Sequence, residues 1–247
     1  MKRVVFNFLV IVAMSLSAVL VSCSNGKVHL LESITYSDGR FEKYEYDNEN
    51  RIAKITQYDM EGNLTFLKTF SYDGNELVKE VVTIGINHVF GASSEYFRNG
   101  NKIVVKTNDS ADDITTTTID LDNDGFPTKV ESMRNLSSYL GIYEIHDGNL
   151  TKHSYKSTVE VAELLLEGIS DYKYDNKKSP LYNCKTPKWW WIYSCVSTQN
   201  NEIEVIDVSN MGEKRVENRY EYDKAGYPTK CTTKDSDGEY VKEFKYK

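Results

Sequence analysis

The fold is decided by the segment YDNENRIAKI at residues 46–55, in which an acidic turn is followed by an alternating stretch. Two further segments follow its template, LDNDGFPTKV at 121–130 and YDKAGYPTKC at 222–231. Asn and Gly tolerate the positive φ of a tight turn, and an Asp side chain can hydrogen-bond the backbone of its own turn. Each unit is therefore predicted to be a β-hairpin turn that leads into a strand.

Shorter versions of the unit recur along the chain, as YDGN at 72–75, RNGN at 98–101 and HDGN at 146–149. Self-similarity at a period of this length indicates an array of repeated units. The turn residues are spaced by 26, 26, 23 and 25 positions and are Asp47, Asp73, Asn99, Asp122 and Asp147.

A second set of turns lies between successive units, for example at 37–39, 58–62 and 236–238. Turns at both ends of the strands give an antiparallel up-and-down meander of roughly 14–17 strands. Open sheets of more than about ten strands tend to curl or split. We therefore expect an all-β fold, in which the meander of repeated hairpins curls into a barrel-like or half-barrel single sheet.

Alternating side chains indicate which face of this sheet is buried. Phe66, Phe70 and Tyr72 share one face of their strand, and Lys68 is a polar exception at the same parity. The chain also contains 18 tyrosines, which form strands well and combine an apolar ring with a polar tip. The aromatic face is expected to look inward.

The periodicity is weak between residues 154 and 169. Ser157 and Glu160 fit a capping box that would open a two-turn helix from Val161 to Leu166. Two strands with a turn between them fit the repeat spacing equally well, so both structures remain open for this segment.

The N-terminus predicts export. Lys2 and Arg3 precede an almost wholly apolar run at 8–21, which is typical of a secretory signal. The run ends in LVSC at 20–23, which resembles the lipobox of bacterial lipoproteins. We expect residues 1–22 to be a lipoprotein signal peptide, 23–30 to be the lipidated Cys23 with a short tether, and 31–247 to be a single all-β repeat domain.

This leader also predicts location and partners. The protein is expected to be an exported lipoprotein, held in the outer membrane through the lipid on Cys23, on a face that the sequence leaves open. Removal of Lys2 and Arg3 with the leader changes the charge from 30 − 37 = −7 to 28 − 37 = −9. An acidic chain without a basic run is a poor ligand for nucleic acid, so the expected partners are the membrane and a glycan or an envelope protein.

Taken in order, the motifs resemble a family of Bacteroidetes lipoproteins, a domain of unknown function described as having a porin-like fold. The repeated units also look like the YD repeats of rearrangement-hotspot proteins. The resemblance implies a barrel-like single sheet and no catalytic residues, and residues 183–191 depart from the regular repeats. The matching positions are Cys23 and the segments 46–55, 174–180 and 222–230.

The densest aromatic run contains Trp189, Trp190, Trp191 and Tyr193. Three consecutive tryptophans cannot all face one side of a strand, so at least one should be partly exposed or covered by a loop. The run is either a patch that stacks a sugar or docks a partner, or a plug that closes one end of the curved sheet. Large aromatic side chains dominate protein cores, which favours the plug.

The acidic turn at 120–131 matches the spacing of a calcium loop. Asp120, Asp122, Asp124 and Glu131 supply oxygen ligands at the required intervals. Against this, Pro127 stands where a backbone donor is needed, and the flanking segments alternate like strands. A hairpin turn is the better interpretation, and no metal site is expected.

Three cysteines remain after Cys23. Cys184 and Cys195 could close a short disulfide loop in an oxidising compartment, or could both be unpaired thiols. Cys231 is left over in either case.

No motif of the chain carries catalytic chemistry or a cofactor. The leading hypothesis is a non-enzymatic envelope lipoprotein with a binding or structural role. One alternative is a carrier that holds an apolar or glycan ligand against its curved aromatic face. The other is a glycan hydrolase that uses a pair of carboxylates, for which the sequence singles out no residue.

Overall fold

The computed structural model describes residues 28–85, 90–109, 113–159 and 164–247. The signal peptide, Cys23 and most of the tether lie outside these residues, so the predictions for them stay predictions. Within the described ranges, sixteen strands account for most of the chain. They are β1 (Leu31–Tyr36), β2 (Phe41–Tyr46), β3 (Ile52–Tyr58), β4 (Leu64–Asp73), β5 (Glu76–Ile84), β6 (Phe90–Asn99), β7 (Lys102–Asp109), β8 (Asp113–Leu121), β9 (Pro127–Arg134), β10 (Ser137–His146), β11 (Asn149–Val159), β12 (Leu164–Lys178), β13 (Asn200–Ser209), β14 (Gly212–Tyr222), β15 (Pro228–Asp235) and β16 (Gly238–Tyr246).

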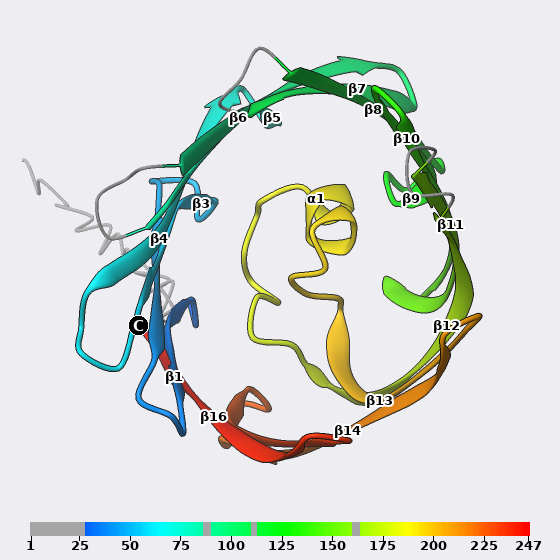
Figure 1. Cartoon of the computed structure of the whole chain (residues 1–247). Coiled ribbons are helices and arrows are strands. Elements are labelled where there is room, and N and C mark those ends of the chain that lie inside the picture. The colour runs from blue at the N-terminus through cyan, green and yellow to red at the C-terminus, as the bar shows by residue number, and fades with distance from the viewer. Residues whose placement is uncertain (1–27, 86–89, 110–112, 160–163) are drawn as a thin grey trace, which may run out of the picture.

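The sheet is a closed barrel, as the ring of strands in Figure 1 shows. Each strand pairs antiparallel with the next along the chain, and β16 returns to pair with β1. The closing register places Ile34 opposite Phe244 and Tyr36 opposite Lys242. The predicted all-β up-and-down meander is confirmed, and of the two expected shapes the structure adopts the full barrel.

The Asp turns of the repeat all lie at one end of the barrel, because one repeat equals two strands. Asp122 shows the mechanism: its Oδ1 accepts the backbone N–H groups of Asp124 and Phe126 over 2.9 Å each. Gly125 takes a φ of +82° in this turn, and Asn50 takes +65° at the equivalent position of the first unit. The Asp side chain thus holds its own turn, as the sequence predicts.

The outer face of the wall carries paired charges. Ion pairs join neighbouring strands between Lys54 and Glu45 at 2.7 Å, and between Lys230 and Glu221 at 3.4 Å. Further outward pairs join β5 to β6, β7 to β8 and β12 to β13. Exposed apolar residues such as Ile169 are interspersed with these charges. The large buried residues lie on the inner face, so the aromatic face looks inward as expected.

Residues 179–199, here called the plug, leave the sheet between β12 and β13 and enter the barrel. Figure 1 shows its helix α1 (Lys188–Tyr193) in the middle of the ring. The plug bonds to the end with the Asp turns: Lys185 N–H donates to Asn50 O over 2.9 Å, and Gln199 N–H donates to Gly148 O over 3.2 Å. The plug therefore closes this end of the barrel.

Two local expectations are decided by this structure. The open segment from Val161 to Leu166 is strand from Leu164 onward, where β12 begins, and 160–163 lie outside the described residues. The tryptophan run is a helix instead of a strand, and no tryptophan of the run is exposed. In the part of the chain that the structure describes, no helix is long and apolar enough to cross a membrane.

Candidate functional site

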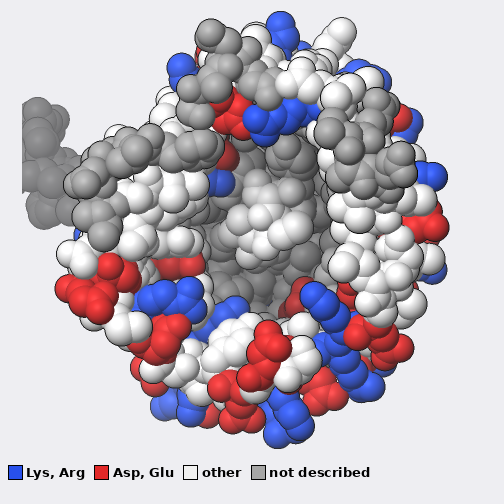
Figure 2. Space-filling model, viewed as in Figure 1, with Lys and Arg blue, Asp and Glu red and all other residues white. Residues whose placement is uncertain are grey.

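The barrel encloses a cavity of about 480 Å³. Inward side chains of β1 to β4 and of β12 to β16 form its wall, and the plug forms its floor. Tyr36, Glu42 and Gln57 line it beside the turns opposite the plugged end, so the cavity extends toward that end. Figure 2 shows the hollow at the centre of the ring, with uncharged atoms at its floor.

Glu42 is held as a hydrogen-bond acceptor on the β2 side of the cavity. Tyr36 and Tyr44 donate their phenolic O–H groups to its two oxygens over 2.6 and 2.8 Å, and Gln57 donates from Nε2 over 3.1 Å. Burial, reinforced by the negative charge of Glu42, raises the pKa of both tyrosines, so they remain neutral donors. The wall itself therefore supplies three donors to this carboxylate.

Glu202 on β13 and Lys242 on β16 are different, because both are cavity residues whose charged groups lack a hydrogen bond or ion pair to any described residue. The Lys242 amine instead lies 6.0 Å from the ring centroid of Tyr36 and 5.6 Å from that of Tyr240. Burial raises the pKa of Glu202 to about 7, and the positive charge of Lys242 partly opposes this shift. Two ionisable groups of opposite charge thus share the cavity without a direct ion pair between them.

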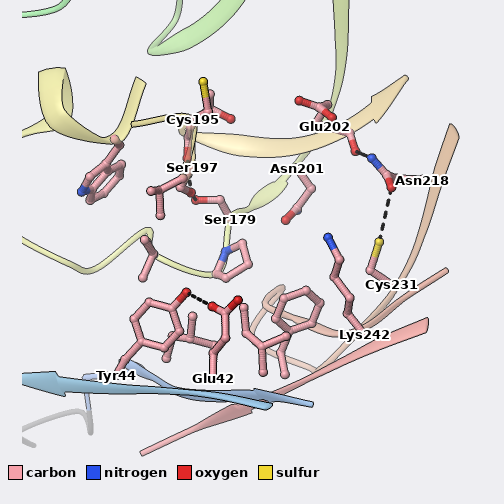
Figure 3. Close-up of a pocket in the computed structure, with 18 of the residues that line it drawn as sticks. Glu42, Tyr44, Ser179, Cys195, Ser197, Asn201, Glu202, Asn218, Cys231 and Lys242 are labelled. Atoms are coloured by element: carbon pink, nitrogen blue, oxygen red, sulfur yellow. Dashed lines mark hydrogen bonds between the residues drawn. The ribbon is translucent and has the colours of Figure 1, made fainter. Parts of the chain in front are cut away.

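Asn201 adds an unused acceptor beside these charges. Its Nδ2 donates to Lys178 O over 3.0 Å and to Asp175 Oδ2 over 3.2 Å, but its buried Oδ1 has no partner among the described residues. The hydroxyl of Tyr174 is likewise buried without a partner within the same ranges. Figure 3 shows the Lys242 side chain pointing into the cavity toward Asn201.

One of the hydrogen bonds that join the plug to the wall lies at the floor of the cavity. Trp190 Nε1 donates to Glu80 Oε2 over 2.8 Å, and Glu80 forms an ion pair with Lys68 at 3.0 Å. Phe70 meets the Trp190 ring edge-on at a centroid distance of 5.0 Å. Lys68, the polar exception at an inward position, is therefore explained by its pairing with Glu80.

A second polar cluster lines the lumen on the β10 and β11 side. His153 Nε2 lies 2.8 Å from the Tyr139 hydroxyl, and the His153 ring stacks on Tyr143 at a centroid distance of 4.5 Å. Burial lowers the pKa of His153, which favours the neutral imidazole. The polar groups of Tyr139, Tyr143 and His153 bond to one another, so their hydrogen-bonding capacity is used within the wall.

Comparison with known proteins gives likenesses among solved structures, at the level of the fold. No protein-family model matches the chain, and no curated protein matches its sequence. Among solved structures, 13 chains match. One is described as a porin-like protein from Bacteroides uniformis ATCC 8492, with 14% sequence identity, a TM-score of 0.37, and coverage of 88% of this chain and 98% of that one. The fold class of this chain follows from its own strand pairing.

The predicted aromatic patch is buried. Trp189, Trp190 and Trp191 expose 2, 0 and 2% of their surface, and Tyr193 is half-buried beside them. A six-residue helix turns consecutive side chains by about 100° each, so three adjacent tryptophans can all find packing partners inside a barrel. Their burial supports the plug, but Trp190 and Trp191 also line the cavity, so a role of this run in stacking a sugar or docking a partner stays a prediction.

The residues that match the spacing of a calcium loop are spread along the hairpin of β8 and β9. Asp120 forms an ion pair with Lys102 at 2.9 Å, and Glu131 forms one with Lys129 at 2.8 Å. Asp122 holds the turn. Among the described residues, no group of three or more His, Cys, Asp or Glu side chains could hold a metal ion.

The three described cysteines are free thiols in the structure, so the Cys184–Cys195 disulfide is not formed there. Cys184 and Cys231 are buried, whereas Cys195 is exposed and lines the cavity. Cys195 takes a φ of +53° directly after α1, where Val196 N–H bonds to Trp191 O over 2.8 Å. The backbone of Cys195 thus ends the helix in a left-handed conformation that usually belongs to glycine.

Sequence reasoning did not identify Glu42, Asn201, Glu202 or Lys242. These residues belong to no motif, and they come together only when β16 closes on β1. One signal could have indicated Lys242: it alternates with Phe244 and Tyr246, so a charge stands at an inward position, as at Lys68.

Proposed function

We propose that this chain is a non-enzymatic binding protein of the bacterial cell envelope, and that the lumen of its barrel holds the ligand. The observation that supports this proposal is the lumen cavity of about 480 Å³. Its size lies within the range of small-ligand pockets, and it combines aromatic walls with a few polar groups, as such pockets do. A purely structural barrel would gain stability by filling this space with side chains.

The outer face of the wall favours a barrel that is surrounded by water over a barrel that spans a membrane as a pore. A barrel that spans a membrane presents an apolar band about 25 Å tall to the lipid, and a Lys or Arg at its centre costs about 2–4 kcal/mol. Here the outward faces carry ion pairs between strands, such as Lys54 with Glu45 and Lys173 with Glu204. The plug closes one end of the barrel, so the lumen is proposed to be a vestibule with one entrance.

The cavity lining favours a polar or amphipathic ligand over a bare hydrocarbon chain. Tyr172, Tyr220 and Phe244 offer rings on which the apolar face of a ligand can stack. Gln57 and Asn218 add amide groups between these rings, although both already bond within the wall. Of the two ligand classes expected for a carrier, a glycan therefore suits the lining better than a lipid tail.

A second candidate function is glycan hydrolysis, which the raised pKa of Glu202, about 7, favours. A carboxyl group with such a pKa suits a general acid. Its only carboxylate companion in the cavity lining is Glu42, which accepts three hydrogen bonds and lies across the cavity in Figure 3. Release of nitrophenol from a panel of nitrophenyl glycosides by the wild type, and its loss in Glu202→Gln, would establish this second function.

The location is proposed from Cys23, which lies outside the described residues. Lipid on this residue would hold the barrel at the outer membrane by its N-terminal tether. Cys23→Ser is expected to move the protein from the membrane fraction to the soluble fraction. A variant that stays in the membrane fraction would contradict the anchor.

The proposed function is tested by a thermal-shift screen of residues 24–247 with neutral oligosaccharides, amino acids, single-chain lipids and calcium. A ligand at 100 times its Kd adds about 2.7 kcal/mol of stability, which gives a measurable rise in Tm. We expect an organic ligand to raise Tm in the wild type and to lose most of that effect in Tyr220→Ala, which removes a wall ring. A cooperative melt without a shift by any organic ligand would contradict lumen binding.

A further inference from the structure

Glu202 and Lys242 differ from the other charged residues of the cavity lining, Glu42 and Lys68, because their charged groups lack a hydrogen bond or ion pair to the described residues. Elsewhere in the lumen Lys68 is neutralised by Glu80 at 3.0 Å, and on the outer face Lys54 is neutralised by Glu45 at 2.7 Å. Glu202 and Lys242 line the same cavity, yet neither has a hydrogen bond or ion pair to any residue that the structure describes. A charge in an enclosed space without a partner costs free energy. A protein that keeps two such charges retains them for a purpose other than stability.

The surroundings of the two charges offer further hydrogen-bonding capacity. The buried Oδ1 of Asn201 and the hydroxyl of Tyr174 have no partner within the described ranges, and both residues line the cavity. The backbone supports this position, because Asn218 Nδ2 donates to Glu202 O over 3.0 Å and ties β14 to β13. The Asn201 oxygen and the Glu202 carboxyl group are thus placed on a fixed wall without a hydrogen-bond partner among the described residues.

From this placement we infer that the lumen carries a subsite for a small zwitterion of the α-amino acid kind, with its ammonium bound by Glu202 and its carboxylate bound by Lys242. The inference rests on the proposed function, because it names the ligand class of the same cavity. The Asn201 oxygen is a second acceptor for the ammonium. The rings of Tyr172 and Tyr220 form the wall against which the ligand's side chain packs.

Charge complementarity distinguishes a zwitterion from a neutral sugar. A neutral ligand would displace water from both charges and neutralise neither, whereas a zwitterion supplies a counter-charge to each. Charge-assisted hydrogen bonds are roughly twice as strong as neutral ones. An ammonium beside Glu202 would also favour its ionised form, which burial disfavours in the empty cavity.

The test measures binding by titration calorimetry to residues 24–247. The probes are the proteinogenic L-α-amino acids, then the N-acetyl and methyl ester derivatives of the tightest binder, with neutral disaccharides for comparison. The variants are Glu202→Gln and Lys242→Met. The matched controls are Glu221→Gln and Lys245→Met, which change exposed charges on the outer wall.

We expect an amino acid to bind the wild type and both control variants with the same affinity. N-acetylation should weaken binding to the wild type by about ten- to a hundred-fold and change binding to Glu202→Gln little. Esterification should likewise weaken binding to the wild type by about ten- to a hundred-fold and change binding to Lys242→Met little. Because the derivatives act on the wild-type protein, the test holds even if one variant fails to fold.

Three results would overturn the inference. They are no amino acid binding at all, equal affinity for the parent ligand and both derivatives, or equal affinity for the wild type and both lumen variants. Binding of a disaccharide or lipid in place of amino acids would leave the proposed lumen-binding function standing and refute the zwitterion subsite. No binding of any probe would count against both.

Discussion

Trp190 in the plug and Glu80 on β5 are joined by a hydrogen bond of 2.8 Å across 110 residues of sequence. It is one of several bonds between the plug and the wall, which also include the bond from Ile52 N–H to Thr186 Oγ1 at 2.8 Å. The ion pair with Lys68 holds Glu80 in place. By contrast, Trp189 is also buried, but its Nε1 has no partner among the described residues. The two tryptophans therefore form a matched pair, because they differ in one hydrogen bond and resemble each other in burial.

We predict that Trp190→Phe destabilises the protein more than Trp189→Phe. Both changes remove a similar volume, but only Trp190→Phe removes a bond to a charged group, which is worth about 1.5–3 kcal/mol. Urea unfolding of residues 24–247 measures the difference. Equal losses of unfolding free energy in the two variants would show that the bond to Glu80 does not anchor the plug.

Glu202 predicts a pH dependence of stability. Its pKa is raised from 4.5 to about 7 by burial, so folding favours the protonated acid. This contribution to stability is fully present below pH 4.5 and is lost as pH rises to about 7. The stability of the wild type relative to Glu202→Gln should fall across this window, and unfolding measured at several pH values checks it.

Burial lowers the pKa of His153, so its contribution to the free energy of unfolding rises with pH, opposite to that of Glu202. His153 is present in both the wild type and Glu202→Gln, so its contribution cancels when their unfolding free energies are subtracted. Glu221→Gln serves as the control, since Glu221 is exposed. If the difference in unfolding free energy between the wild type and Glu202→Gln does not change with pH, water solvates Glu202 freely and the account of its burial is wrong.

The fold could be predicted largely because the repeats are local. The Asp turns fix each hairpin within about ten residues of sequence, and period two fixes which side chains face inward. The plug helix could not be predicted in the same way, because a short aromatic run does not distinguish helix from strand. Its conformation depends on partners such as Glu80 and Phe70, which are far away in the sequence.

The candidate site was harder to predict, for a reason visible at β13. Glu202 and Glu204 have the same parity, so simple alternation places them on the same face. A register shift between β12 and β13 separates them: Glu202 lines the cavity, and Glu204 forms an ion pair with Lys173 at 2.5 Å outside it. Such an irregularity depends on the neighbouring strand and leaves no signal in a single sequence.

The hydrogen bonds of the Asp turn predict that Asp122 contributes more to stability than its neighbour Asp124. Asp122→Ala removes an acceptor for two backbone N–H groups and should cost about 1–2 kcal/mol. Asp124→Ala should change stability little, because no hydrogen bond of the described chain uses its side chain. Thermal unfolding with and without calcium measures both variants. A calcium-dependent rise in Tm that both variants abolish would instead support the calcium loop.

Two glycines on the lumen wall are predicted to respond differently to alanine. A Cβ at Gly168 would lie 2.6 Å from the Tyr155 hydroxyl and 2.8 Å from Val208 O, which is backbone and cannot move away. At Gly141 the nearest atom is the Tyr139 hydroxyl at 2.7 Å, at the end of a side chain. Gly168→Ala should cost about 1–3 kcal/mol and Gly141→Ala less. The reverse order in urea unfolding would refute this packing.

The most direct test of lumen binding is the reaction of Cys195 with a small thiol reagent. In residues 24–247, Cys184 and Cys231 are buried and Cys195 is exposed in the cavity. We predict that methyl methanethiosulfonate modifies one thiol per native chain, that Cys195→Ser removes this reaction, and that a ligand which raises Tm slows it. A native chain in which Cys195 does not react, or reacts at the same rate with the ligand bound, would contradict the claim that the lumen is the binding site.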